Sequence, residues 1–179
     1  MLDYQSSFGF DHSDTGTYIA PVEPVSTSKT LKALQEAGED YEWYPTTQVQ
    51  IDTIKNDIAR LKEAYEISGR NEKPTILDIG AGDGRVVTAL RDLLNDEKDK
   101  LDEPFKAYAI EKSTVHINSY RSKDISLVGT DFYETNLISK TADFAFVNPP
   151  YSDYAAWVAR IIEELDFTVL YAVIPQRWV

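Results

Sequence analysis

Two short stretches of this sequence hold residue types and spacings that suit chemistry. The first, Asp78-Ile-Gly-Ala-Gly-Asp-Gly84, continues an apolar run and places three glycines at alternate positions. The second, Asn148-Pro-Pro-Tyr151, follows another apolar run about sixty residues later. Short apolar runs of this kind are typical of buried strands, so we expect both motifs in turns at strand ends.

The glycine-rich stretch predicts a sharp turn that leads from a strand into a helix. Gly80, Gly82 and Gly84 let the backbone turn tightly and let a ligand approach the main chain. A turn that opens a helix offers backbone N–H groups and a favourable dipole to an anionic group. The stretch lacks the Gly-Lys-Ser/Thr of the NTPase phosphate loop and matches the dinucleotide fingerprint only loosely. Alone, it indicates a nucleotide-like ligand of no particular kind.

The second motif is the more specific of the two. A pair of prolines, Pro149 and Pro150, fixes the backbone and removes two N–H donors. The side-chain oxygen of Asn148 and the carbonyl of Pro149 remain as acceptors. Two acceptors directed at one NH2 group would hold a planar amine, and Tyr151 would offer an aromatic surface on which a flat group can stack. A plain Asn-Pro-Pro-Tyr turn is the alternative interpretation.

The elements around these motifs alternate between strand and helix, which predicts an α/β fold. The expected strands are Thr75–Ile79, Lys106–Ile110, Ile125–Val128, Asp143–Val147 and Thr168–Ile174. The expected helices are Lys29–Ala37, one capped by Thr46 or Thr47 and ended by Gly69, Arg85–Leu94, Ser113–Tyr120, and one capped by Ser152. The apolar side of this last helix is expected to include Trp157. This alternation predicts a doubly wound, Rossmann-like parallel sheet of about five strands with right-handed crossovers.

The N-terminal part differs from the rest in composition. Residues 1–45 show no sustained periodicity, and we expect an irregular arm and linker there, ahead of a core at 46–179. The helix that opens the core carries an apolar stripe, which consists of Val49, Ile51, Ile54, Ile58, Leu61 and Tyr65.

Polar or unusual residues follow every expected strand. Glu111 could accept hydrogen bonds from both hydroxyls of a ribose, or it is a surface carboxylate at a strand end. Asp131 could bind an exocyclic amine and Phe132 could pack on a purine, or the pair is a turn aspartate beside a core phenylalanine. Pro175 follows the fifth strand. Because ligands of parallel sheets bind beyond the carboxyl ends of the strands, these positions predict one common site.

Composition narrows the class of protein further. The chain has 179 residues, enough for one domain, and its formal net charge is −12. There is no cysteine, which excludes thiolate chemistry and fits the cytoplasm as the expected location. The sequence shows no apolar run of membrane-spanning length and no paired histidines, so neither a membrane nor a metal is expected. The charge is explained by solubility, by a substrate other than nucleic acid, by a basic patch hidden in the fold, or by a DNA-binding part located elsewhere.

The two motifs together resemble the class I methyltransferases that use S-adenosylmethionine, and among them the adenine-N6 DNA methyltransferases of phages and bacteria. Trp43-Tyr-Pro-Thr46 is similar to the segment that closes over the cofactor in many of these enzymes. The resemblance implies that Asn148, Pro149, Pro150 and Tyr151 are the catalytic residues. It implies that the cofactor is bound by Tyr44, Pro45, Thr46, Asp78, Gly80, Ala81, Gly82, Gly84, Glu111, Asp131, Phe132 and Asn148.

The activity implied by the resemblance is methyl transfer to an exocyclic amine, with adenine in DNA as the first expectation. The same tetrad occurs in enzymes that methylate protein glutamine, and similar tetrads occur in RNA base methyltransferases. The family sheet has two further strands beside the fifth. Their absence here suggests a fragment, a partner chain that covers this edge, or a truncated protein that binds the cofactor without catalysis.

Overall fold

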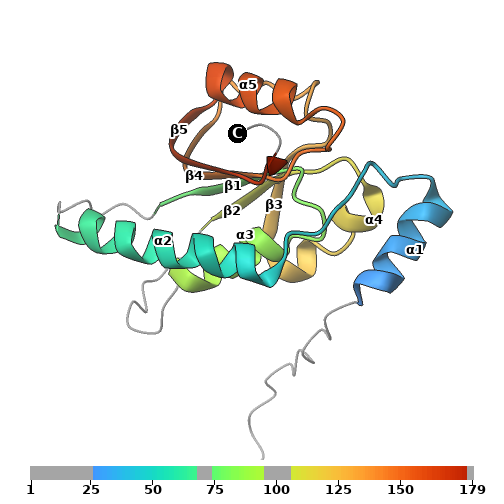
Figure 1. The fold of residues 1–179 in the computed structure, drawn as a ribbon, viewed down its shortest axis with the longest axis horizontal. Coiled ribbons are helices and arrows are strands. Elements are labelled where there is room, and N and C mark those ends of the chain that lie inside the picture. Colours follow the sequence, from blue (N-terminus) through green and yellow to red (C-terminus); the bar gives the residue numbers. More distant parts are fainter. Residues whose placement is uncertain (1–25, 68–73, 95–105, 177–179) are drawn as a thin grey trace, which may run out of the picture.

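The computed structural model describes residues 26–67, 74–94 and 106–176 (Figure 1). The helices are α1 (Thr27–Ala37), α2 (Gln48–Ile67), α3 (Arg85–Leu94), α4 (Thr114–Ile117) and α5 (Tyr154–Glu164), with a 3-10 turn η1 at Arg121–Lys123. The strands are β1 (Ile76–Ile79), β2 (Ala107–Ile110), β3 (Ile125–Gly129), β4 (Thr141–Val147) and β5 (Asp166–Ala172). The expected alternation of strand and helix is confirmed.

The five strands form one sheet in the order β3-β2-β1-β4-β5, and all four pairings are parallel. The chain runs outward from β1 to β3 and then returns to the other side of β1 with β4. The switch point therefore lies between β1 and β4, the two strands that carry the sequence motifs at their carboxyl ends. This is the expected doubly wound, Rossmann-like sheet.

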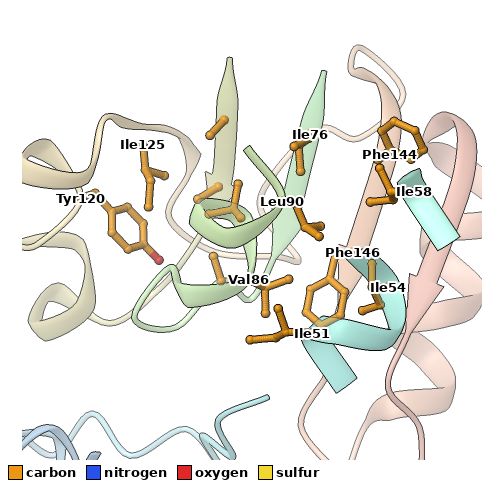
Figure 2. Packing of buried hydrophobic residues seen from close by; sticks show 14 residues of the cluster. Ile51, Ile54, Ile58, Ile76, Val86, Leu90, Tyr120, Ile125, Phe144 and Phe146 are labelled. Carbon is orange, nitrogen blue, oxygen red and sulfur yellow. The ribbon is translucent and has the colours of Figure 1, made fainter. Parts of the chain in front are cut away.

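Helices cover both faces of the sheet, α2 and α3 on one side and α5 on the other (Figure 1). Because side chains alternate along a strand, each face has its own core. Phe144 and Phe146 of β4 pack with Ile54 of α2 and Leu90 of α3 (Figure 2). On the opposite face, residues of the same strands pack against Ile161 and the rest of the apolar side of α5.

Helix α2 begins as expected. The Thr47 hydroxyl accepts from the backbone N–H of Gln50 at 3.4 Å, and the Gln50 side chain accepts from the backbone N–H of Thr47 at 2.9 Å. This reciprocal pair satisfies two N–H groups that the helix leaves unbonded. The expected stripe holds at Ile51, Ile54 and Ile58, but Val49 is 76% exposed, because the helical period places it on the opposite side of α2 from these three residues. Gly69 and the side chain of Tyr65 lie outside the described residues.

Several expected boundaries are wrong, and α1 and β4 each begin two residues earlier than predicted, at Thr27 and Thr141. The helix predicted at Ser113–Tyr120 is limited to the short α4, capped by the Ser113 side chain, because the chain turns where the Tyr120 ring enters the core. Helix α5 begins after Asp153, and Ser152 does not cap it. Strand β5 begins two residues early, at Asp166.

Strand β5 pairs only with β4 in the described sheet and is half-buried along most of its length. Among the described residues, no helix is long and apolar enough to cross a membrane. The expected arm at 1–45 is described only from residue 26 onward. There, α1 ends at Gly38 in a left-handed conformation, and the segment that follows packs on the core.

Candidate functional site

The carboxyl ends of the central strands surround one cavity of about 420 Å³. Among the predicted site residues, those that line it are Tyr44, Pro45, Thr46, Asp78, Gly80, Ala81, Glu111, Asp131, Phe132, Asn148 and Pro150. Gly82, Gly84, Pro149, Tyr151 and Pro175 do not line it. The motifs after β1, β2, β3 and β4 are thus brought together, as the parallel sheet requires.

The glycine turn has the geometry that its sequence predicts. Gly80, Gly82 and Gly84 all have positive φ angles, of 76°, 53° and 74°. The backbone N–H of Gly82 donates to the Glu111 carboxylate at 2.7 Å, and its carbonyl accepts from the Tyr120 hydroxyl at 2.6 Å. Gly84 packs tightly in the core instead, where a Cβ would lie 2.5 Å from Ile125. Glu111 and Tyr120 therefore hold the N–H and the carbonyl of the turn in place, with its main chain close to the cavity.

Asp78 is the most unusual group in the cavity wall. Its side chain is 1% exposed, and neither carboxylate oxygen has a hydrogen-bond partner. Burial, and then the nearby charge of Glu111, raise the pKa of Asp78 well above its ordinary value. A buried carboxylate without a partner is costly, so this position fits a ligand that brings a positive group or N–H donors.

Glu111 is buried and already accepts two backbone hydrogen bonds. They come from Gly82 at 2.7 Å and from Ser113 at 2.8 Å, one to each carboxylate oxygen. Burial raises the pKa of Glu111 despite these bonds. Each oxygen keeps a second lone pair, so the carboxylate can still accept from vicinal hydroxyls of a ribose. The two backbone bonds fix its orientation toward the end of β1.

Asp131 and Phe132 have more local partners than the sequence suggests. Asp131 accepts from Lys112 at 3.0 Å and from the backbone N–H of Tyr133 at 2.8 Å, and the Lys112 hydrogen bond is the main reason that its pKa is lowered. Phe132 is 4% exposed, and its ring is stacked on Trp157 with 4.0 Å between ring centres. The aromatic wall of the cavity therefore also includes Trp157, which the sequence pattern assigned to the apolar side of a helix.

Asn148 is held by the segment that precedes α2. Its Nδ2 donates to the carbonyl of Tyr44 at 2.8 Å and to the Thr46 hydroxyl at 3.2 Å. A carbonyl can only accept, so the amide nitrogen must face Tyr44, which fixes Oδ1 as the side-chain atom left to accept from a ligand. The neighbouring Tyr151 ring is stacked on the Tyr44 ring, 4.9 Å between centres and 10° from parallel.

Residues 39–46, which we call the strap, cross the cavity between α1 and α2. Glu39 accepts from the hydroxyls of Ser113 and Thr114, both at 2.8 Å, at the start of α4. Glu42 accepts from the backbone N–H of Ser152 at 3.0 Å, beyond the proline motif. The strap is thus attached to the walls on both sides of the cavity.

Trp43 lies on the glycine turn. A Cβ at Gly82 would fall 2.3 Å from the Trp43 indole nitrogen, so glycine is needed there for this contact. The Trp43 ring also contacts His116, with 4.8 Å between ring centres, and the Arg85 guanidinium lies 5.7 Å from the centre of the Trp43 ring. His116 is 3% exposed, and its Nε2 has no partner.

Acidic groups predominate in the cavity wall. They are Glu39, Asp40, Glu42, Asp78, Asp83, Glu111, Asp131 and Asp153, against Arg85 and Lys112. Both basic groups are paired, Arg85 with Asp83 at 2.6 Å and Lys112 with Asp131 at 3.0 Å. No group of three or more His, Asp or Glu side chains in the described ranges could hold a metal ion.

Several wall residues carried no signal in the sequence. Glu39, Glu42 and His116 belong to no motif and acquire their roles from contacts between distant segments. Asp83 is part of the glycine stretch, but its pairing with Arg85 shows only in the structure.

No family profile matches this chain, and no curated protein matches it. Solved structures do match. An RNA methyltransferase from Salinibacter ruber, in complex with S-adenosyl-L-homocysteine, superposes with a TM-score of 0.50 at 16% identity, over 76% of this chain and 82% of that one. The plantazolicin methyltransferase BpumL, in complex with a triazolic desmethylPZN analogue and SAH, superposes with a TM-score of 0.52 at 13% identity, over 84% and 53%.

These likenesses and the strand order give the chain the class I methyltransferase fold. The chain spans most of the first structure and about half of the second. At such low identity the likeness extends to the fold alone.

Proposed function

We propose that this protein is an S-adenosylmethionine-dependent methyltransferase that acts on an exocyclic amine of a planar group, with adenine N6 in DNA as the first candidate. The main support for the proposal is the fixed orientation of the Asn148 side-chain amide. Its nitrogen is committed to Tyr44 and Thr46, so its oxygen is left for an acceptor amine at the edge of the cavity.

The cavity wall fits the cofactor on three counts. Asp78, buried and without a partner, would bind the cationic amino group of the methionine part, next to the glycine turn. Glu111 would bind the ribose hydroxyls. Phe132 and Trp157 would form the aromatic wall for the adenine, beside Asp131. The acidic lining also suits a ligand that carries a sulfonium cation.

When bound, S-adenosylmethionine supplies a methyl group that is already activated on sulfur, so this chain's own residues need only position and polarise the acceptor. The oxygen of Asn148 and the carbonyl of Pro149 would accept the two N–H groups of the amine. Those two bonds would orient the nitrogen lone pair toward the methyl carbon, and Tyr151 would stack on the flat group. A base in a duplex would first have to leave the helix.

The acidic lining favours a second candidate, methylation of a glutamine side chain in a protein. That acceptor is also a planar NH2 group, and it brings no phosphates near the carboxylates of Asp40, Glu42 and Asp153. A nucleic acid would meet repulsion at the cavity unless a basic surface elsewhere compensates for it.

Asn148→Ala tests the proposal. We expect methyl transfer to fall by about a hundredfold or more, because the amine loses one of its two fixed acceptors. Binding of S-adenosylhomocysteine, measured by calorimetry, should change little. Transfer from tritiated cofactor is measured on adenine-containing DNA, on RNA and on a glutamine peptide, so that the preferred acceptor is found in the same experiment.

The matched control is Asn136→Ala, which removes an exposed asparagine side chain outside the cavity wall. It should transfer methyl groups at the wild-type rate. Normal transfer by Asn148→Ala would contradict the role proposed for the tetrad. Absence of transfer by the wild type to all three acceptors would contradict the proposed activity.

A further inference from the structure

The stacked pair of Tyr44 and Tyr151 has a consequence for acceptor binding. We propose that the ring of Tyr44 occupies the position of the planar acceptor on Tyr151 and acts as a gate that the acceptor must displace. This inference rests on the proposed function, because it concerns the acceptor position of the same site.

The geometry of the pair is that of an aromatic ring bound in a stacking site. The two ring centres lie 4.9 Å apart with planes 10° from parallel, as a flat acceptor on Tyr151 would lie. Core packing does not explain the contact, because Tyr44 is 54% exposed and Tyr151 is 41% exposed. Two tyrosines from distant parts of the sequence therefore stack at the mouth of the cavity, immediately beyond Asn148 and the two prolines.

The ring of Tyr44 can leave Tyr151 without disturbing the rest of the site. Asn148 is held by the backbone carbonyl of Tyr44 and by the Thr46 hydroxyl, and neither contact involves the ring. The strap itself is attached through Glu39 and Glu42. A rotation about the side-chain torsions of Tyr44 would then uncover Tyr151 while Asn148 stays oriented, since exposed side chains change rotamer within nanoseconds.

The adjacent strap residue makes the corresponding contact on the cofactor side. Trp43 lies on Gly82, the glycine whose N–H is bound by Glu111. Neighbouring side chains of the strap thus cover the two halves of the site, Trp43 the glycine turn and Tyr44 the stacking surface. The gate therefore acts on acceptor binding specifically, and Tyr44 is a positioning residue for the acceptor step.

The test is steady-state kinetics of Tyr44→Ala with an adenine-containing single-stranded oligodeoxynucleotide and tritiated S-adenosylmethionine. Removing the ring removes the competitor for Tyr151, so KM for the oligonucleotide should fall by roughly two- to tenfold. If the Tyr44 ring only supported the structure of the site, its removal would instead raise KM for the oligonucleotide or lower kcat. Tyr44→Phe keeps the ring and should restore the wild-type KM.

Tyr133→Ala is the matched control, because Tyr133 is also 54% exposed and lines the cavity but is not stacked on Tyr151. It should not lower KM. An unchanged or raised KM for Tyr44→Ala would overturn the gate and would indicate that both tyrosines hold the acceptor between them. Absence of transfer by both wild type and Tyr44→Ala, with cofactor binding intact, would overturn the proposed adenine acceptor and the gate together.

Discussion

Asp78 illustrates how a single residue of this chain is placed for a ligand at the expense of stability. Strand β1 fixes the side chain between α3 and the cavity, where both oxygens lack partners. Because burial raises its pKa, the folded protein binds a proton at Asp78 more tightly than the unfolded chain does. The free energy of unfolding therefore decreases as pH rises through the raised pKa.

Asp78→Asn should separate the effect of Asp78 on stability from its effect on ligand binding. The variant removes the buried charge, so we expect a higher melting temperature than the wild type at pH 8 and a smaller difference at pH 5. S-adenosylhomocysteine should bind roughly tenfold or more weakly, because a charge-assisted hydrogen bond to its amino group is lost. Calorimetry and thermal unfolding measure both quantities, and Asp166→Asn, at an exposed position in β5, is the control. A variant that is less stable and binds equally well would contradict the role of Asp78.

At the scale of elements, the strap links parts of the fold that the sheet alone leaves separate. Its contacts join the start of α4, the glycine turn and the proline motif. One strap residue, Glu42, has a positive φ of 56°, a conformation that is unfavourable for a side chain other than glycine. The contacts at both ends of the strap hold this conformation in place.

The junction of strap and α4 should make stability depend on pH. Burial lowers the pKa of His116 to about 4, with smaller effects from Asp83, Lys123, Arg85 and Glu39. The unfolded chain binds a proton near pH 6.5 and the folded chain only near pH 4, so stability is lost as pH falls through this window. Between pH 7 and pH 5 the loss should be up to about 2 kcal/mol.

His116→Gln should remove this part of the pH dependence, which urea unfolding at pH 7 and pH 5 measures. His12→Gln is the matched control, because it removes the only other histidine of the chain. If the His116 variant lost as much stability between the two pH values as the wild type, the histidine would not be buried in its neutral form.

The sheet was predictable from the sequence, and the resemblance placed Trp43–Thr46 of the strap near the cofactor, but the polar contacts that attach the strap were not predictable. Strands such as Ile76–Ile79 and Thr141–Val147 contain apolar runs that indicate a strand, and the alternation of strands with helices along the chain predicts their parallel pairing. Glu39 and Glu42 are not part of any periodic pattern of apolar residues, and their hydrogen-bond partners lie far away in the sequence. Polar contacts of this kind depend on the assembled fold, so a local pattern cannot reveal them.

The candidate site was likewise predictable from the sequence only in part. Glu111 and Asn148 were predicted because parallel strands place their carboxyl ends at one edge, which makes position in the sequence informative, whereas Asp78 lies within β1 and was implied only by the family resemblance. Trp157 was assigned to a helix core, since its spacing is that of an apolar helix face. The expected cap at Ser152 was wrong, because α5 begins one residue later and has Asp153 at its N-cap position.

For the whole molecule, charge is the property that bears most on function. The formal net charge is −12, and carboxylates outnumber basic groups in the cavity wall. A cationic ligand is attracted to such a cavity and a polyanion is repelled, and both effects weaken with added salt. The cofactor carries a positive sulfonium that its product lacks, so we expect S-adenosylmethionine to bind at least as tightly as S-adenosylhomocysteine at low ionic strength.

Calorimetric titration of the wild-type protein with S-adenosylmethionine, S-adenosylhomocysteine and ADP tests the central claim most directly. The cavity geometry predicts saturable binding of both adenosyl compounds at one site per chain. It predicts no measurable binding of ADP, because its phosphates would meet the acidic wall around Asp78. Failure of the folded protein to bind either adenosyl compound, or equal binding of ADP, would contradict the assignment of this cavity to S-adenosylmethionine.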